Sequence, residues 1–220
     1  MDVLYFLKRR TGFIRYFYDT GGEPFLETIR KIEAGESPFG EPHDSEDGEP
    51  AFQVEWSEAT TALEMLGRTC NSMLSASLQL YFKAWETEAH ITWEPKERAK
   101  AFNRGVKAYL QSLGEALKFS LDACPANFEI LEQVILARNR DQHPDHITRL
   151  SVTHDATTLE KYPQLFFISE SERKIYCNAE MRNIPWMSPT VHVSRETLFA
   201  AIDQVEALGE WLEERRFDAK

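Results

Sequence analysis

The segment from Ser57 to about Glu88 carries apolar side chains in steps of three and four residues. This spacing places them on one face of an α-helix. A helix of that length spans roughly 45 Å, so other parts of the chain must cover its apolar face. The residues of this apolar face are Ala59, Leu63, Leu66, Cys70, Met73, Leu74, Leu80, Tyr81 and Trp85.

The same pattern returns after the Glu94-Pro95 break and continues from Phe102 to Leu121, before Cys124-Pro125. Proline suits the first turn of a helix, so a second long helix is expected there. Because the connection between the two long helices is short, they should pack antiparallel as the centre of a bundle.

Asn127 can cap the next helix, whose apolar face contains Leu131 and Val134. Pro144 limits that helix, because a residue before proline avoids helical angles, and this places His143 at the helix end. A last amphipathic helix is expected over 194–217, beginning at a Ser194 cap. Its inward residues are Leu198, Ile202, Val205, Leu208 and Leu212.

The N-terminal part predicts a helix over 3–18 that stops near Gly21-Gly22, and a short helix over 24–34. Phe6, Phe13 and Phe17 fall on one helical stripe, which favours core packing. The alternative is that these rings, with the basic residues between them, stack on RNA.

Two segments lack helical periodicity. Residues 35–54 are rich in Asp, Glu, Gly and Pro, which is typical of a solvated acidic loop, although mimicry of nucleic acid is an alternative. Residues 155–193 are irregular, with a small β-hairpin expected between 165–168 and 174–177. The predicted fold is therefore mainly α: a single domain over 1–220, a helical bundle with two long antiparallel helices and a β-hairpin insertion before the C-terminal helix.

The composition narrows the class of protein further. No apolar run approaches the roughly 18 residues of a membrane span, and the three cysteines lie far apart, which favours reduced thiols in the cytoplasm. The net charge of −11 argues against a protein that coats nucleic acid. Residues 1–18, however, carry four basic side chains against one acid, so a local basic surface remains open.

The segment from Arg138 to His143 is the expected site of chemistry. Arg138 lies four residues after Val134 and should continue the buried stripe, where a guanidinium needs a partner. Asn139 and His143 are four residues apart and share a helix face. A histidine that moves protons and a cation that stabilises phosphate suit cleavage of RNA by its own 2′-hydroxyl.

This segment, Arg-Asn-Arg-Asp-Gln-His, resembles the signature of the HEPN superfamily, in which Arg, often followed by Asn, precedes His by a few residues. The resemblance covers about residues 55–150 and the last helix. It implies a metal-independent endoribonuclease of a toxin or phage-defence system, which works as a homodimer with two motifs facing one cleft. It also implies catalytic roles for Arg138, Asn139 and His143.

Other interpretations of the same residues remain. Arg140 and Arg149 are either solvated residues or contacts to the RNA backbone. Metal binding by His143, His146 and a nearby Asp is disfavoured because Pro144 breaks the helix that would align them, and no cofactor is expected. The rival to the enzyme is a catalytically silent helical protein that binds a partner protein, such as an antitoxin, or a nucleotide. Arg149 with His154 repeats the Arg-to-His spacing without the Asn.

Overall fold

A computed structural model describes residues 2–40, 51–143, 148, 150–176 and 188–218. The described residues form helices and loops, with no strand longer than the isolated bridge between Thr153 and Thr190. The helices are α1 (Val3–Ala34), α2 (Gln53–Glu88), α3 (Pro95–Asn103), α4 (Val106–Leu117), α5 (Phe128–Gln142), α6 (Ala156–Lys161), α7 (Glu170–Tyr176) and α8 (Arg195–Asp218). The mainly α prediction is confirmed.

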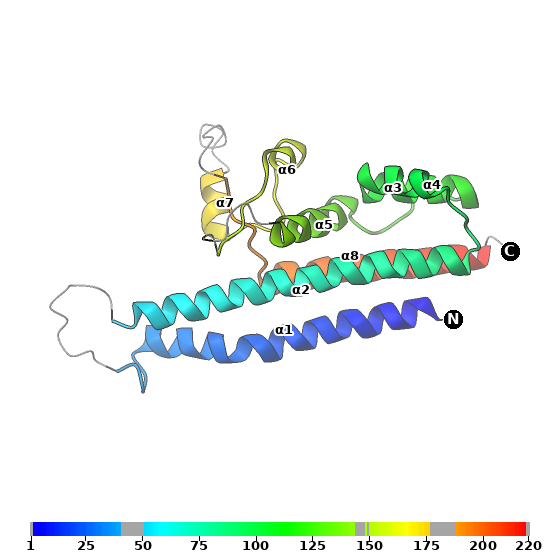
Figure 1. Cartoon of the computed structure of the whole chain (residues 1–220). Helices are drawn as coiled ribbons and strands as arrows, with labels where there is room; N and C mark the ends of the chain where they lie inside the picture. The colour runs from blue at the N-terminus through cyan, green and yellow to red at the C-terminus, as the bar shows by residue number, and fades with distance from the viewer. Residues whose placement is uncertain (1, 41–50, 144–147, 149, 177–187, 219–220) are drawn as a thin grey trace.

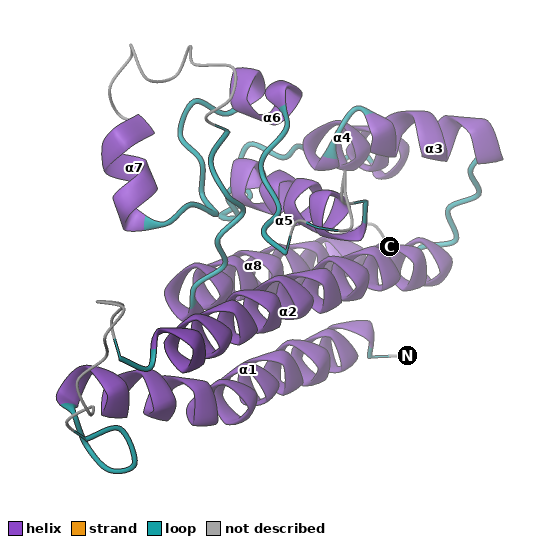
Figure 2. Cartoon of the chain, turned by 60° about the vertical axis from the view of Figure 1, so that its left-hand side comes forward, coloured by secondary structure: helices purple, strands orange, loops and turns teal. Residues whose placement is uncertain are grey.

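Three long helices form the base of the molecule. Helices α1 and α2 run antiparallel, and α8 lies alongside both (Figure 1). Helices α3 to α7 lie on the other side of α2 and α8 from α1 (Figure 2). The predicted C-terminal helix is confirmed: Ser194 caps it by accepting from the Thr197 N–H at 3.3 Å, and all five of its predicted inward residues are buried.

The predicted stop at Gly21-Gly22 is wrong, because α1 continues through it to Ala34. Pro24 sits inside the helix, where it removes one backbone hydrogen bond. The glycines allow α1 to approach α2 closely: a Cβ at Gly22 would lie 3.3 Å from the Leu63 side chain. Packing against α2 therefore outweighs the local tendency to break.

The predicted long helix after Pro95 is also divided, into α3 and α4. Gly105 separates them with a φ of 112°, which a side chain rarely adopts. Glu132 of α5 occupies the space beside it, where a Cβ at 105 would lie 2.5 Å from Oε2, and accepts from the Val106 N–H at 2.6 Å. Thus α5 caps α4, and the long antiparallel pair is α1 with α2.

The predicted β-hairpin is wrong because residues 170–176 form α7, while Cys177 lies outside the described residues. Ser169 begins this helix: its hydroxyl accepts from the Glu172 N–H at 3.3 Å and donates to the Glu172 carboxylate at 3.1 Å. Ser-x-x-Glu is a sequence signature of a helix N-terminus, and this signal outweighs the apolar run before it.

The predicted acidic loop falls mostly on residues 41–50, outside the described residues, and α2 already begins at Gln53. No helix in the described part of the chain is long and apolar enough to cross a membrane.

Candidate functional site at the end of α5

Helix α5 is fixed from its first residue. Asn127 caps it, its side chain accepting from the Glu129 and Ile130 N–H groups at 2.9 and 3.3 Å, as the sequence predicted. Leu131, Val134 and Ala137 are at most 2% exposed and face the core. These contacts hold α5 against α2 and α8, so the position of its C-terminal end is set by the core.

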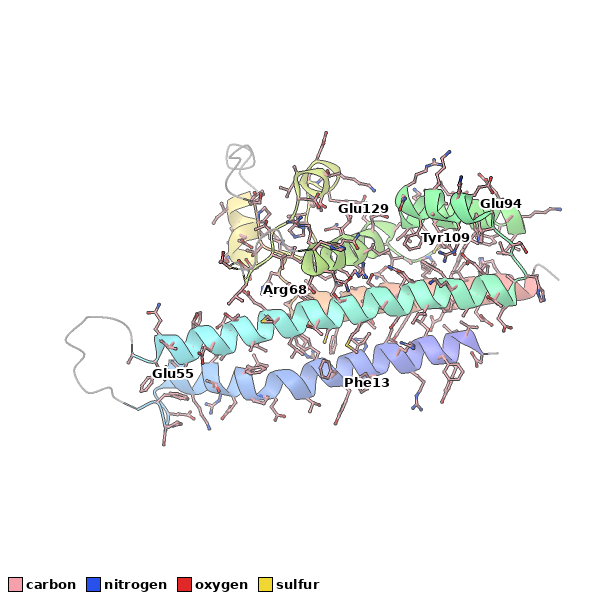
Figure 3. The ribbon with its side chains drawn as sticks, in the orientation of Figure 1. Phe13, Glu55, Arg68, Glu94, Tyr109 and Glu129 are labelled. Atoms are coloured by element: carbon pink, nitrogen blue, oxygen red, sulfur yellow. The ribbon has the colours of Figure 1, made fainter. Side chains whose placement is uncertain are left out.

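The buried guanidinium of this region belongs to Arg68 of α2, not to Arg138. Arg68 is 5% exposed, and Figure 3 places it between α2 and α5. Its Nε donates to Asp141 Oδ1 at 3.2 Å and its Nη2 donates to the Leu150 carbonyl at 3.0 Å. Ser72 donates to the other Asp141 oxygen at 3.2 Å. Since a buried charge without a partner is costly, Asp141 anchors the end of α5 to α2.

Arg140 anchors the same helix end in another direction. Its Nε donates to the Thr153 carbonyl at 2.8 Å, which connects α5 to the segment that precedes α6. The side chain is half-buried rather than fully solvated. Its contact with RNA stays a prediction, and Arg149 lies outside the described residues.

Arg138, Asn139 and His143 have little part in holding the fold. The Arg138 Nη1 donates to Asn139 Oδ1 at 3.0 Å, and the described residues contain no acidic partner for Arg138. Ala137, not Arg138, takes the buried position of the stripe. Asn139 and His143 are exposed, and the His143 N–H closes the helix on the Asn139 carbonyl at 3.1 Å.

The three side chains therefore start from one helix end, where Asn139 and His143 are exposed and Arg138 is half-buried. A cation, an amide and an imidazole in this arrangement can bind an anionic ligand and transfer protons to it. Helix carbonyls without a partner gather at the same end and favour nearby cations. The described residues contain no group of three His, Cys, Asp or Glu side chains suited to a metal ion.

His154, the second histidine preceded by Arg at this spacing, is structural. It is 3% exposed, its Nε2 lies 2.8 Å from the Phe167 carbonyl and its backbone N–H donates to the Pro189 carbonyl at 2.9 Å. Burial lowers the pKa of this imidazole, although the Phe167 carbonyl and nearby acids oppose the shift. A buried, neutral histidine with its ring bonded to a backbone carbonyl cannot reach a substrate.

A second buried charge cluster joins α2, α3 and α4. Glu86, 7% exposed, accepts from Arg98 Nε at 3.0 and 2.9 Å and from the Tyr109 hydroxyl. Burial and the Glu86 carboxylate both raise the pKa of Tyr109. Arg98 and Tyr109 both bind Glu86, and Glu86 and Tyr109 are buried, so we assign the cluster to stability rather than to chemistry.

Sequence reasoning missed Arg68 and Ser72 as determinants of this site. A signal was present, because Arg68 is the only charged residue from Met65 to Phe82. A lone charge in the centre of a long apolar helix indicates a buried ion pair.

Comparisons with known protein families, with curated proteins and with solved structures find no match.

Proposed function

We propose that this chain is a metal-independent endoribonuclease of the HEPN type, with its active site at the exposed end of α5. One observation carries the proposal. Within a single six-residue segment, Arg140 and Asp141 are bonded to other parts of the fold, whereas Asn139 and His143 are exposed and the half-buried Arg138 is hydrogen-bonded to Asn139. The residues that the HEPN signature makes catalytic are thus the ones without a bond to another element among the described residues.

The proposed reaction uses RNA as the source of its own nucleophile. The 2′-hydroxyl attacks the neighbouring phosphorus, the bond to the 5′ oxygen breaks, and a 2′,3′-cyclic phosphate and a 5′-hydroxyl form. His143 takes the proton from the nucleophile or gives one to the leaving oxygen. Arg138 stabilises the charge that gathers on the phosphate, and Asn139 orients Arg138 through their hydrogen bond.

A single histidine cannot act as base and acid in the same step, so a second copy of the chain would complete the site. We therefore place the enzyme in a homodimer, in the cytoplasm, within a toxin or phage-defence system. An antitoxin or another partner protein would keep its activity in check.

A catalytically silent partner-binding protein is the second candidate. A specific observation favours it: large apolar side chains of α1 and α2 are exposed, among them Phe13 at 55% and Leu80 at 46%. Surfaces of this kind bind proteins, and the net charge of −11 disfavours RNA.

The test is cleavage of a single-stranded RNA in excess EDTA, with mass analysis of the fragment ends. Cyclic-phosphate and 5′-hydroxyl ends are expected, and DNA of the same sequence should stay intact because it lacks the nucleophile. Arg138→Ala should abolish cleavage. Gln142→Ala is the matched control, because Gln142 is an exposed residue of the same turn. Loss of cleavage in EDTA, or 5′-phosphate products, would contradict the proposal.

A further inference from the structure

The outer side of α2 is exposed and uncharged over more than four turns. From Met65 to Phe82 the only charged residue is Arg68, which is buried. The exposed positions of this stretch are Met65, Thr69, Ala76 and Leu80, and Met73 is half-buried among them. The solvent-facing side of a helix normally carries charged residues, so this side is unusual for a surface that meets only water.

An aromatic stripe of α1 borders this side of α2. Phe6, Phe13 and Phe17 are 53%, 55% and 37% exposed, so their predicted place in the core is wrong. The rings of Phe13 and Phe17 stack at 6.2 Å, and Figure 3 marks Phe13 on α1. Phe6 and Phe13 line a shallow groove together with Arg9 and Arg10 of α1 and with Met73 and Ala76 of α2. We call the surface formed by these side chains of α1 and α2 the hairpin face. It consists of Phe6, Phe13, Phe17, Met65, Thr69, Met73, Ala76 and Leu80.

The hairpin face has the size of a small protein interface. On α2 it extends from Met65 to Leu80, roughly 24 Å of helix, and two packed helices are roughly 20 Å wide. The product, about 500 Å² per copy in projection, is comparable with the largest apolar patch of a typical monomer and corresponds to a weaker contact than the roughly 800 Å² that each partner buries in a stable complex.

Charge along the α1–α2 hairpin indicates what covers this face. The first half of α1, residues 3–18, has four basic residues and no acid, whereas residues 19–34 have four acids and two basic residues. Helix α2 begins beside the acidic half and adds Glu55, Glu58 and Glu64 there. The hairpin is thus basic at one end and acidic at the other. Among the described residues, neither Arg9 nor Arg10 has an acidic partner.

We propose that the hairpin face is the contact between two copies of this chain, packed antiparallel. A two-fold axis perpendicular to the helices sets the basic end of each hairpin against the acidic end of the other, so the same surface is complementary to itself. RNA suits the face less well, because the exposed residues of α2 between Met65 and Leu80 include no cation and Arg9 and Arg10 are the only basic residues that line the groove. The hairpin face lies on the flank of α2 opposite α5, so this contact is distinct from the one that would complete the α5 site, and the inference holds whether or not the chain cuts RNA.

Sedimentation equilibrium of the full chain tests the inference. We expect a dimer, with a dissociation constant raised about tenfold or more by Phe13→Glu and by Leu80→Glu, because each places a charge in an apolar contact. Ile175→Glu is the control: Ile175 is 42% exposed, on α7 rather than on the hairpin. Circular dichroism establishes that each variant folds.

Charge reversal tests the orientation. Arg9→Glu with Arg10→Glu should weaken the dimer, and adding Glu55→Lys with Glu58→Lys should restore it. A wild-type monomer at about 100 µM would overturn the inference, as would a dimer that Phe13→Glu leaves unchanged. Binding of the monomer to anionic vesicles or single-stranded RNA through Phe13 would assign the face to another ligand. If adding Glu55→Lys and Glu58→Lys weakens the dimer further, the antiparallel arrangement is excluded.

Discussion

The two sides of α2 reverse the usual distribution of polar and apolar residues. The side that faces α5 is buried yet contains Arg68, Asn71 and Ser75, whereas the opposite flank is exposed yet contains Met65 and Leu80. On the inner side, Asn71 Nδ2 donates to the Val134 carbonyl at 3.0 Å and Arg68 binds Asp141. A buried polar group is stable only with a defined partner, so these contacts fix where α5 lies.

The two sides of α2 therefore have different roles. The polar inner side positions the end of α5 and, with it, the segment that contains Arg138 and His143. The apolar outer flank contributes little within one copy, and its side chains are available to another molecule. Two substitutions and one pH dependence test this distinction.

Asp141→Ala should have the largest effect. It leaves the Arg68 guanidinium, 5% exposed, without its closest acid, and the free energy of unfolding should fall by about 3 kcal/mol. Urea denaturation measures this. Glu64→Ala is the control, because Glu64 is 38% exposed and 3.8 Å from Arg68, and it should change stability by less than about 0.5 kcal/mol. Equal effects would show that Asp141 is not the anchor.

Acid should weaken the packing around His154. Burial lowers the pKa of this histidine in the folded chain, so the unfolded chain binds the proton more readily. The stability that neutral His154 contributes is present above its unfolded pKa of about 6.5 and is lost as the pH falls below that value. Urea denaturation at neutral and mildly acidic pH should show this loss, and His154→Asn should reduce it. An unchanged pH dependence in the variant would contradict the assignment.

Leu80→Ala should have the smallest effect on the stability of one copy. Leu80 is 46% exposed, and truncation should cost less than about 0.5 kcal/mol when the chain is dilute enough to be monomeric. Leu78, two residues earlier, is 0% exposed, and Leu78→Ala should cost about 3 kcal/mol. Similar losses at the two positions would mean that the outer flank of α2 is covered within the same chain.

The sequence predicted elements whose signals are local. Asn127 and Pro144 bracket α5, and Ser194 begins α8, because caps and proline act on the adjacent turn. The break at Gly105 depends on Glu132, which is distant in the chain, and the contact between Arg68 and Asp141 joins two helices. The stripe of Phe6, Phe13 and Phe17 has core periodicity, but the chain has no element that covers it in the described structure. Periodicity shows which residues share a face, not what that face meets.

For the site itself, the sequence predicted the helix end, with Asn139 and His143 on one face, but it assigned the buried guanidinium to Arg138 instead of Arg68. The stripe of α5 passes through Ala137, one position before Arg138, and a shift of one residue turns a helical side chain by about 100°. Arg138 consequently lies beside the buried stripe rather than in it, half-buried and hydrogen-bonded to Asn139.

The initial rate of RNA cleavage by His143→Ala measures whether the exposed end of α5 is the proposed active site. His143 is exposed and its side chain has no structural partner among the described residues, so the variant should keep the wild-type free energy of unfolding within about 0.5 kcal/mol. The account predicts a folded protein whose cleavage falls by at least about 100-fold, the contribution typical of a catalytic acid or base. A folded His143→Ala variant that cuts RNA at the wild-type rate would contradict it.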